Sequence, residues 1–254
     1  MPRFFVRKEQ IEGGVVTVLG DDAHHISRSL RMAAGERITV CDMQKFEYEC
    51  ELTDFLPDRV LAKVLHTAKC DTEPPYRAHI YQALPKGDKL DSIIQKSVEC
   101  GAWALTPFES ERCVVRAKDG AEEKKTERRC RIALEAAKQS GRGIVPEVYP
   151  TVKFQKAIEQ ACKADICLFC YEGDGAASLS ATLKSAKKAL QEKTYPTVSV
   201  VIGSEGGFSQ AEAEMARQAG MTVVNLGKRI LRTETAASFV LACLVYEMEL
   251  KAEF

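Results

Sequence analysis

The chain has 254 residues, a length that suits two domains or one large one. It has 36 Lys and Arg residues and 36 Asp and Glu residues, so the net charge is zero with His neutral. A zero net charge excludes a protein that coats nucleic acid with a basic surface all round, although not a local basic patch. Charged residues make up 28% and apolar residues 45% of the chain, a globular balance that argues against disorder, collagen and coiled coil.

The N-terminal segment does not have the pattern of a targeting signal. Residues Met1–Lys8 return to charge before the apolar region of a signal peptide could form. No run in the chain approaches the ~18 consecutive apolar residues of a membrane span. We therefore expect a cytoplasmic protein without a membrane partner, in a compartment where its 10 cysteines stay reduced.

Residues 1–71 have the pattern of a small β-rich domain. Short apolar or alternating runs between turn signals predict strands at Val15–Leu19, Arg37–Cys41 and Arg59–Leu65. A helix is predicted between the first two strands, with Asp22 as its cap and Gly35 as its stop. Its inner face would carry Ala23, Ile26, Leu30 and Ala33 or Ala34, and its outer face His24, Arg28 and Arg31.

Two adjacent prolines, Pro74 and Pro75, hold the backbone extended and predict a linker at residues 72–76. From residue 77 to residue 254, strand patterns alternate with helix patterns, which predicts an α/β domain with a mainly parallel sheet and helices on both faces. The predicted strands are Ala78–Leu84, Trp103–Phe108, Val145–Tyr149, Asp165–Tyr171, Thr197–Ile202 and Thr222–Leu226. The predicted helices cover about 88–100, 122–139, 152–162, 178–191, 209–219 and 234–250.

The strand at 165–171 contains the nearest approach to a metal-binding motif. Cys167 and Cys170 are formally a C-x-x-C pair, but the sequence has no second such pair and no nearby His to complete a zinc site. Apolar neighbours surround both residues, as in a buried strand where Cys acts as a small hydrophobe. We therefore predict no metal site.

A glycine-rich turn follows the fifth predicted strand of the α/β domain. Gly203, Gly206 and Gly207 would let backbone N–H groups approach a ligand closely, and Ser209 with Glu212 forms an S-x-x-E capping box that starts the next helix. A loop after a parallel strand and before a helix is where open α/β sheets bind ligands. The spacing does not match the dinucleotide-binding fingerprint, the P-loop or the nucleophile elbow. On this loop alone, a ligand site and a tight structural turn are both open.

A second loop, Asn225–Ala236, follows the next strand and leads into the final helix. Thr233 would cap that helix, and Glu234 suits its first turn, where a negative charge opposes the helix dipole. The final helix is apolar nearly all round, so it needs burial on more than one side. Its own core can supply one side, and a partner subunit can supply another.

Together the two loops resemble the RsmE family of 16S ribosomal RNA uridine-N3 methyltransferases. The segments that carry the resemblance are Ile202–Ser209 and Leu226–Ala236, and further matches follow in the same order through the whole chain. One departure is Ser204, where the family usually has Pro; it leaves the loop less rigid but should keep its backbone donors. The further matches are Phe4–Val6, His25–Met32, Lys86–Leu90, Ile94–Lys96, Ser110–Arg112 and Glu135–Arg142.

The resemblance implies a fold that composition and periodicity do not reveal. The family belongs to the SPOUT superfamily, whose C-terminal domain ties a trefoil knot, a feature nearly absent from other proteins, and binds S-adenosylmethionine in a bent conformation. Its N-terminal domain is a PUA-like barrel that helps to hold RNA, and its members are homodimers. We therefore expect S-adenosyl-L-methionine as cofactor, a PUA-like β-barrel at 1–71, a knotted methyltransferase domain at 77–254 and a homodimer through the C-terminal helix.

Methylation of uridine N3 requires loss of the N3 proton from an unpaired or extruded base. We expect Arg232 to stabilise the developing anion and Glu234 or Glu205 to accept the proton. In the competing interpretation, Glu234 is simply a helix-start acid and Arg232 contacts a phosphate. The residues expected to bind the cofactor are Tyr171, Gly203, Glu205, Leu226, Gly227, Ile230, Leu231 and Ala236.

RNA contacts are expected to be mostly electrostatic, with 16S rRNA or the small ribosomal subunit as the partner. Singly, each basic residue is more simply a solvated charge, whereas together they would form a track on a neutral protein. The candidates are Arg3, Arg28, Arg31, Lys86, Lys89, Lys96, Arg112 and Arg142.

Two other functions are open. A related methyltransferase of the same superfamily would act on a ribose 2′-OH or on tRNA, and the identity of the methylated nucleoside would distinguish it. A protein of a different class would be a non-catalytic ribosome-assembly factor that binds RNA through its small domain. Failure to bind S-adenosylmethionine would favour that second alternative.

Overall fold

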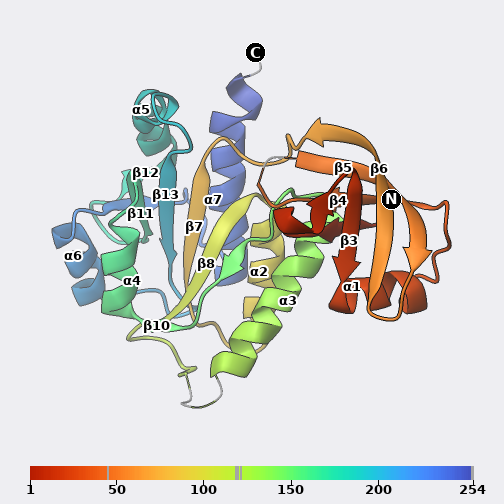
Figure 1. Cartoon of the computed structure of the whole chain (residues 1–254). Helices are drawn as coiled ribbons and strands as arrows, with labels where there is room; N and C mark the ends of the chain where they lie inside the picture. Colours follow the sequence, from red (N-terminus) through yellow and green to blue (C-terminus); the bar gives the residue numbers. More distant parts are fainter. Residues whose placement is uncertain (45, 118–119, 121, 253–254) are drawn as a thin grey trace. The chain divides into compact units, whose positions relative to one another are not determined.

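The computed structural model describes residues 1–44, 46–117, 120 and 122–252. The chain divides into two compact units. The first contains Met1–Glu73 with Ala137–Val145, and the second contains Pro74–Ala136 with Pro146–Phe254. Each unit has its own sheet, and Figure 1 shows the elements of both in chain order by colour.

The first unit is built on a six-stranded sheet with the order β1-β4-β5-β6-β3-β2. β1 runs parallel to β4, and the other neighbours are antiparallel. Its core includes Phe4, Ile38 and Leu52, which are at most 1% exposed, and the predicted small β-rich domain is confirmed. The elements are β1 Arg3–Phe5, the short 3-10 turn Lys8–Gln10, β2 Ile11–Glu12, β3 Val15–Leu19, α1 Gly20–His24, β4 Arg37–Cys41, β5 Phe46–Phe55 and β6 Arg59–Lys69.

The helix predicted between Asp22 and Gly35 is wrong at both ends. The helix begins at Gly20, continues as a π-helical turn at His25–Ser29, and ends there. Arg31 takes a left-handed backbone conformation with φ of 53°, which a right-handed helix does not allow. The apolar spacing continues past this point in the sequence, so periodicity alone did not reveal where the backbone leaves the helix.

The second unit is an α/β fold around an eight-stranded sheet in which every pairing between neighbours is parallel. The strand order is β10-β8-β7-β13-β11-β14-β12, with β9 beside β8. In Figure 1, α4 lies on one side of β7, β8 and β13, and α2 and α7 lie on the other. The predicted mainly parallel sheet with helices on both faces is confirmed.

Most boundaries in this unit lie within a few residues of the prediction. Two short strands, β10 and β12, were not predicted, and β9 is shorter than the predicted strand at 145–149. The strands are β7 Arg77–Ala83, β8 Ala102–Glu109, β9 Glu147–Val148, β10 Val152–Lys153, β11 Ile166–Cys170, β12 Ala177–Ser178, β13 Thr197–Ile202 and β14 Thr222–Asn225. The helices are α2 Lys89–Glu99, α3 Glu122–Ser140, α4 Phe154–Ala161, α5 Leu179–Gln191, α6 Gln210–Gln218 and α7 Thr233–Met248, followed by the 3-10 turn Leu250–Ala252.

The strand order determines where loops from distant parts of the sequence meet. β13 lies between β7 and β11, so Ile202 of β13 pairs with Gln82 of β7 although 120 positions separate their numbers. Because the sheet is parallel, the carboxyl ends of β7, β11, β13 and β14 lie at the same edge. The loops that follow these strands, including both loops singled out in the sequence, therefore converge there.

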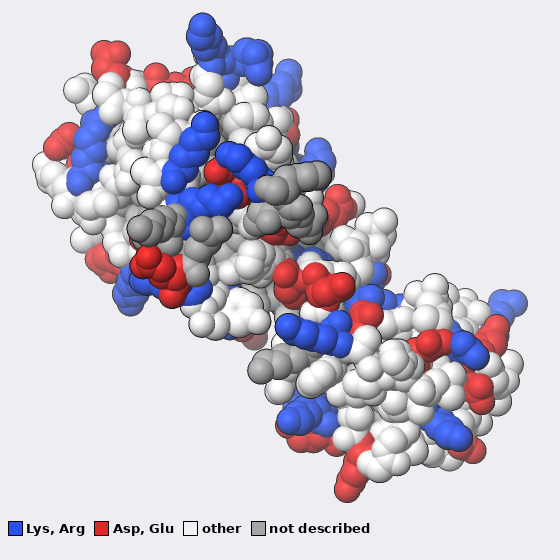
Figure 2. Space-filling view, turned by 90° about the horizontal axis from the view of Figure 1, so that it is seen from above, with Lys and Arg blue, Asp and Glu red and all other residues white. Residues whose placement is uncertain are grey.

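The last helix, α7, packs against α2, α5 and β13. Ala237, Val240 and Leu244 are fully buried on it, whereas Tyr246 is 60% exposed. In the part of the chain that the structure describes, no helix has the length and apolar character needed to cross a bilayer. Acidic and basic side chains are interspersed on the face drawn in Figure 2, in keeping with the zero net charge.

A buried ion pair holds the segment Ala137–Val145 in the first unit. The carboxylate of Glu73 accepts hydrogen bonds from Arg142 Nε at 2.9 Å and Nη2 at 2.6 Å, and from the N–H of Gly143 at 2.8 Å. Arg142 is 3% exposed, so this bidentate carboxylate replaces water around its charge.

Replacing Glu73 by Ala should lower the free energy of unfolding by about 3 kcal/mol, because a buried arginine loses its carboxylate. Urea unfolding of the full chain would show a lower midpoint. Glu9→Ala, at an exposed acid of the same unit, is the matched control and should change stability by less than about 0.5 kcal/mol. Equal midpoints for the two variants would contradict the role given to Glu73.

Candidate active site

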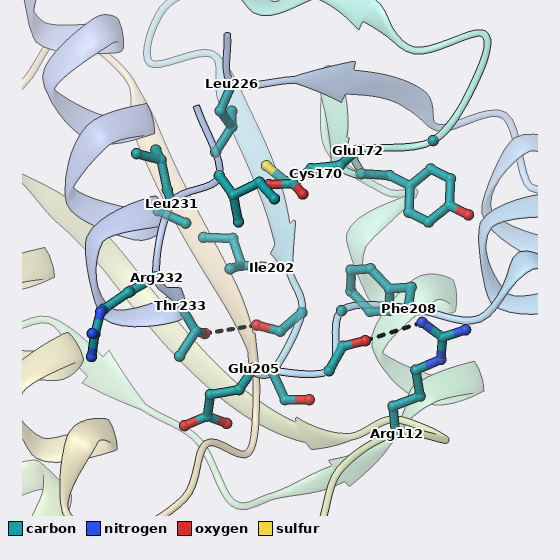
Figure 3. Close-up of a pocket in the computed structure, with 18 of the residues that line it drawn as sticks. Arg112, Cys170, Glu172, Ile202, Glu205, Phe208, Leu226, Leu231, Arg232 and Thr233 are labelled. Carbon is teal, nitrogen blue, oxygen red and sulfur yellow. Dashed lines mark hydrogen bonds between the residues drawn. The ribbon is translucent and has the colours of Figure 1, made fainter. Parts of the chain in front are cut away.

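A cavity of about 700 Å³ opens where β11, β13 and β14 end, beside the start of α7 (Figure 3). Its volume lies in the range of pockets that bind cofactors and other small molecules. It is lined by Lys89, Arg112, Cys170, Tyr171, Glu172, Gly173, Ile202, Gly203, Ser204, Glu205, Gly206, Gly207, Phe208, Leu226, Ile230, Leu231, Arg232, Thr233 and Ala236.

The glycine loop folds back on itself so that Gly203 packs tightly against Gly207 and Phe208. A Cβ on Gly203 would lie 3.1 Å from Cα of Gly207 and 3.3 Å from the ring of Phe208. The N–H of Gly207 donates to the carbonyl of Ser204 at 2.9 Å, and Gly207 has a φ of 64°, which glycine adopts without strain. The loop is therefore a tight turn and also one wall of the cavity, so the two interpretations of its glycines are compatible.

Thr233 does not cap α7, and that prediction was wrong. The N-cap position is Arg232, which makes no side-chain cap hydrogen bond. The buried hydroxyl of Thr233 instead donates to the carbonyl of Gly203 at 2.7 Å and accepts from Nε2 of Gln82 at 2.9 Å. The amide of Gln82 also donates to the Gly203 carbonyl at 3.2 Å. These bonds join the ends of β7 and β13 to the first turn of α7.

The capping box predicted at the start of α6 is confirmed. The hydroxyl of Ser209 accepts from the N–H of Glu212, and the Glu212 carboxylate accepts from the N–H of Ser209 at 2.9 Å. Glu212 is 6% exposed, and its other oxygen accepts from the N–H of Glu111 at 2.8 Å. In the same region Arg112 donates to the carbonyl of Gly206 at 3.1 Å. The loop after β8 is thus tied to the glycine loop at two places.

Apolar side chains form one side of the cavity. Ile202, Leu226 and Leu231 line it, and Figure 3 shows them in one group on the side away from Arg112. Phe208 is 3% exposed, and its ring centroid lies 4.3 Å from that of Phe169. An aromatic cluster therefore supports the glycine loop from beneath.

Two acids and one lysine from three segments form a charged group: Lys89 and Glu205 line the cavity, and Glu234 lies beside it, in contact with Lys89 but not in the lining. Nζ of Lys89 lies 2.8 Å from Oε1 of Glu205 and 3.5 Å from Oε2 of Glu234. The Glu205 carboxylate also accepts from the N–H of Lys86 at 3.1 Å. Burial acts to raise the pKa of Glu205, but the hydrogen bonds from Lys89 and from backbone N–H groups outweigh it and lower that pKa. The hydrogen bond to Glu205 raises the pKa of Lys89.

The candidate catalytic residues occupy unequal positions. Oε2 of Glu234 is buried and, among the described residues, has no hydrogen-bond partner. Glu205 is already engaged by Lys89 and Lys86. Arg232 is exposed, and in Figure 3 its side chain points to the opposite side of the site from Arg112.

The other candidate residues are placed as follows. The predicted cofactor residues that line the cavity are Tyr171, Gly203, Glu205, Leu226, Ile230, Leu231 and Ala236, whereas Gly227 lines a second cavity beside α5 and α7. Of the predicted RNA contacts, Lys89 and Arg112 line the first cavity, and Lys86 and Lys96 are exposed in the same unit. In the first unit, Arg28 and Arg31 are exposed, Arg3 is paired with Glu47 at 2.9 Å, and Arg142 is buried against Glu73.

Gln82 and Phe208 are site residues that were not predicted. Gln82 is 1% exposed near the end of a strand whose neighbours are mostly apolar, and a lone amide at such a position is a signal that sequence reasoning could have used. Phe208 has no such signal, because an aromatic residue beside a glycine loop is common in cores. No group of three or more potential metal ligands occurs among the described residues.

Comparison with known proteins relates these features to a family. A model of the RNA methyltransferase domain matches residues 72–245, and a model of the RNA methyltransferase PUA domain matches residues 18–65. The chain is 36% identical, over 98% of its length and 98% of the relative's, to ribosomal RNA small subunit methyltransferase E of Bacillus subtilis (strain 168). It belongs to the family of ribosomal RNA small subunit methyltransferase E. The resemblance to RsmE inferred from the two loops is thereby confirmed.

Other members of this family align over most of the chain. Ribosomal RNA small subunit methyltransferase E of Synechocystis sp. is 32% identical over 94% of this chain and 76% of its own length. A solved structure of ribosomal RNA small subunit methyltransferase E from Neisseria gonorrhoeae, bound to S-adenosyl methionine, has a TM-score of 0.81 and 31% identity, and the match covers 97% of both chains.

Replacing Thr233 by Val keeps the shape of the side chain but removes the hydroxyl that joins Gly203 to Gln82. We expect a loss of about 2 kcal/mol in the free energy of unfolding, since two buried hydrogen bonds disappear. Thr235→Val, at an exposed position on the same helix, is the matched control and should be close to neutral. Thermal or urea unfolding measures both, and a neutral Thr233→Val would contradict the proposed bridge.

Proposed function

We propose that this family member transfers a methyl group from S-adenosylmethionine to N3 of a uridine in 16S ribosomal RNA. The observation that carries the proposal is the cavity in which a glycine turn and an apolar group adjoin Lys89 and Glu205, with Glu234 in contact with Lys89 at its edge. The match to the Bacillus subtilis protein over 98% of both chains supports the choice of small-subunit RNA as the substrate.

The residues of the cavity fit this cofactor. Ile202, Leu226 and Leu231 offer apolar surface for an adenine ring, and the close turn at Gly203 leaves backbone groups accessible to it. Oγ of Ser204 is buried at the cavity without a hydrogen-bond partner among the described residues, so a polar group of the ligand can pair with it. When bound, S-adenosylmethionine would supply an electrophilic methyl group, whose bond to sulfur breaks as the bond to N3 forms, leaving S-adenosylhomocysteine.

Uridine N3 is an imide nitrogen whose electron pair becomes available after proton loss. We assign proton acceptance to Glu234, because its Oε2 is the carboxylate oxygen left without a donor hydrogen bond, whereas Glu205 is held by Lys89 and Lys86. The N3 proton moves to Glu234, and the electron pair stays on N3. The protein positions the two reactants, which is the main contribution that such a transfer needs.

The basic residues around the cavity would meet the RNA. Arg232, Arg112 and Lys86 lie at or beside the mouth of the cavity and are exposed, so we assign them phosphate contacts, with Arg232 nearest to the reacting base. On the first unit, Arg28 and Arg31 have the same exposure. The candidates Arg3 and Arg142 are engaged in ion pairs, and we assign them to the fold.

The partner subunit, domain division and knot implied by the resemblance remain part of this proposal. A second cavity of about 540 Å³, lined by α5 and α7 residues including Phe239 and Tyr246, supports a homodimer through α7. We retain residues 1–71 as the RNA-binding PUA-like domain, 72–76 as the linker and 77–254 as the knotted methyltransferase domain, and we place the protein in the cytoplasm with its ribosomal substrate.

The direct test is the identity of the modified nucleoside. Small subunits isolated from cells lacking the protein, treated with the purified protein and labelled S-adenosylmethionine, should yield N3-methyluridine by mass spectrometry. A ribose 2′-O-methyl product, or a product from tRNA alone, would replace this proposal by the related activity. Absence of any product together with no cofactor binding would favour the non-catalytic assembly factor.

Gly203→Ala should weaken S-adenosylmethionine binding roughly tenfold or more, because overpacking of this kind costs about 1–3 kcal/mol. The added Cβ would press on the backbone of Gly207 and on Phe208. Gly220→Ala is the control, since Gly220 lies outside the cavity and has no heavy atom within 4 Å; its φ of 87° strains an alanine, so this variant shows what backbone strain away from the cavity does to binding. Calorimetry should give it the same affinity as the original protein, and equal affinity for Gly203→Ala would remove the glycine loop from the cofactor site.

A further inference from the structure

Lys89 occupies a place that helix stability does not explain. It is the first residue of α2, where the helix dipole disfavours a positive charge, and Asp88 before it makes no side-chain cap hydrogen bond. Its side chain is 34% exposed and lines the cavity instead of extending into solvent. What holds it there is the pair of carboxylates of Glu205 and Glu234.

The two contacts of Lys89 are unequal. The contact with Glu205, at 2.8 Å, is a short hydrogen bond that is reinforced by the N–H of Lys86 on the same carboxylate. The contact with Glu234, at 3.5 Å, is longer and leaves the acceptor capacity of Oε2 unfilled. Glu205 therefore anchors the ammonium group, and the ammonium group faces Glu234 without saturating it.

We propose that Lys89 is a positioning residue for catalysis: anchored by Glu205, it holds the carboxylate of Glu234 in the place where it accepts the proton of the base that is methylated. This inference rests on the proposed function. It also replaces the RNA contact predicted for Lys89 from the sequence, because the ammonium group is directed to carboxylates of its own chain. A uridine proton that reaches Glu234 arrives at a carboxylate whose charge Lys89 has kept in place.

Other charges near the group do not substitute for Lys89. The other charged residues that line the cavity are Arg112, which bonds to the Gly206 carbonyl, and Glu172 and Arg232. On α2 the next acid, Asp91, is paired with Arg128 of α3 at 2.6 Å. Asp88 and Lys86, in the loop before α2, are exposed to solvent. Among these described groups, Lys89 is the cation that contacts both acids.

The sign of the effect on pH dependence follows from the charges. An ammonium group favours the ionised form of a nearby carboxylate, so its removal makes that carboxylate easier to protonate. If Glu234 must be ionised to accept the N3 proton, activity in a variant without this charge should fall off at a higher pH than in the original protein.

The test uses the full-length protein and the small-subunit substrate, with kcat, KM for RNA and cofactor affinity measured across pH. Lys89→Met should lower kcat, with the loss greatest on the acidic limb of the profile. Cofactor affinity should stay within about twofold, and kcat should recover in part at alkaline pH. Lys89→Arg should restore the position of the limb. Lys163→Met, at an exposed lysine after α4, is the matched control and should reproduce the original profile.

Three results would overturn the inference. A loss of kcat by the same factor at every pH would make Lys89 merely structural. A higher KM for RNA with a weaker salt dependence and an unmoved pH limb would return it to a phosphate contact. The third is a limb that still moves when Lys89→Met is combined with Glu234→Gln, since the acid proposed to respond is then absent. Failure of the proposed function is a separate outcome, in which the original protein forms no N3-methyluridine at any pH.

Discussion

The carbonyl oxygen of Gly203 is the point on which the site depends. It accepts hydrogen bonds from the hydroxyl of Thr233 and the amide of Gln82, so one peptide group joins the end of β13 to the end of β7 and to the start of α7. All three residues are separated from water to a large extent, and lost bonds there would not be replaced by solvent. Without this junction the two loops would be independent turns, and the cavity between them would lose its defined shape.

The junction also explains how a neutral protein gathers charge at one place. Because Thr233 bonds the first turn of α7 to the Gly203 carbonyl, Glu234 is brought near Glu205, and the start of α2 supplies Lys89, which contacts both acids. By contrast, Arg142 in the first unit is almost fully buried against Glu73, whose carboxylate also accepts from the backbone N–H of Gly143. In the group around Lys89, one carboxylate oxygen of Glu234 has no hydrogen-bond donor among the described residues and is available to accept a proton. The Glu73 carboxylate already accepts hydrogen bonds at both oxygens and therefore serves the stability of the fold.

Prediction succeeded where the physical cause was local and failed where it was not. The Ser209–Glu212 capping box is a contact across one helical turn, and both residues adopt the expected roles. Thr233 satisfies the same local rule, yet its hydroxyl bonds to Gly203, 30 positions earlier, which the rule cannot take into account. The helix predicted to end at Gly35 was wrong for another reason. Its apolar spacing continues along the sequence, but the backbone leaves the helical conformation by Arg31.

The sequence by itself determined the class of fold and the small β-rich N-terminal domain. It also determined the two loops that carry the site and the family to which they point. Strand periods, helix periods and short motifs depend on neighbouring residues, so the sequence shows them directly. The tertiary structure decided which residues of those loops act together. Parallel pairing of β7 with β13 brings Gln82, Lys89, Gly203 and Glu234 to one edge of the sheet, and no spacing along the chain encodes that meeting. From the sequence Lys89 was therefore predicted to contact RNA, whereas the folded chain directs it to two carboxylates.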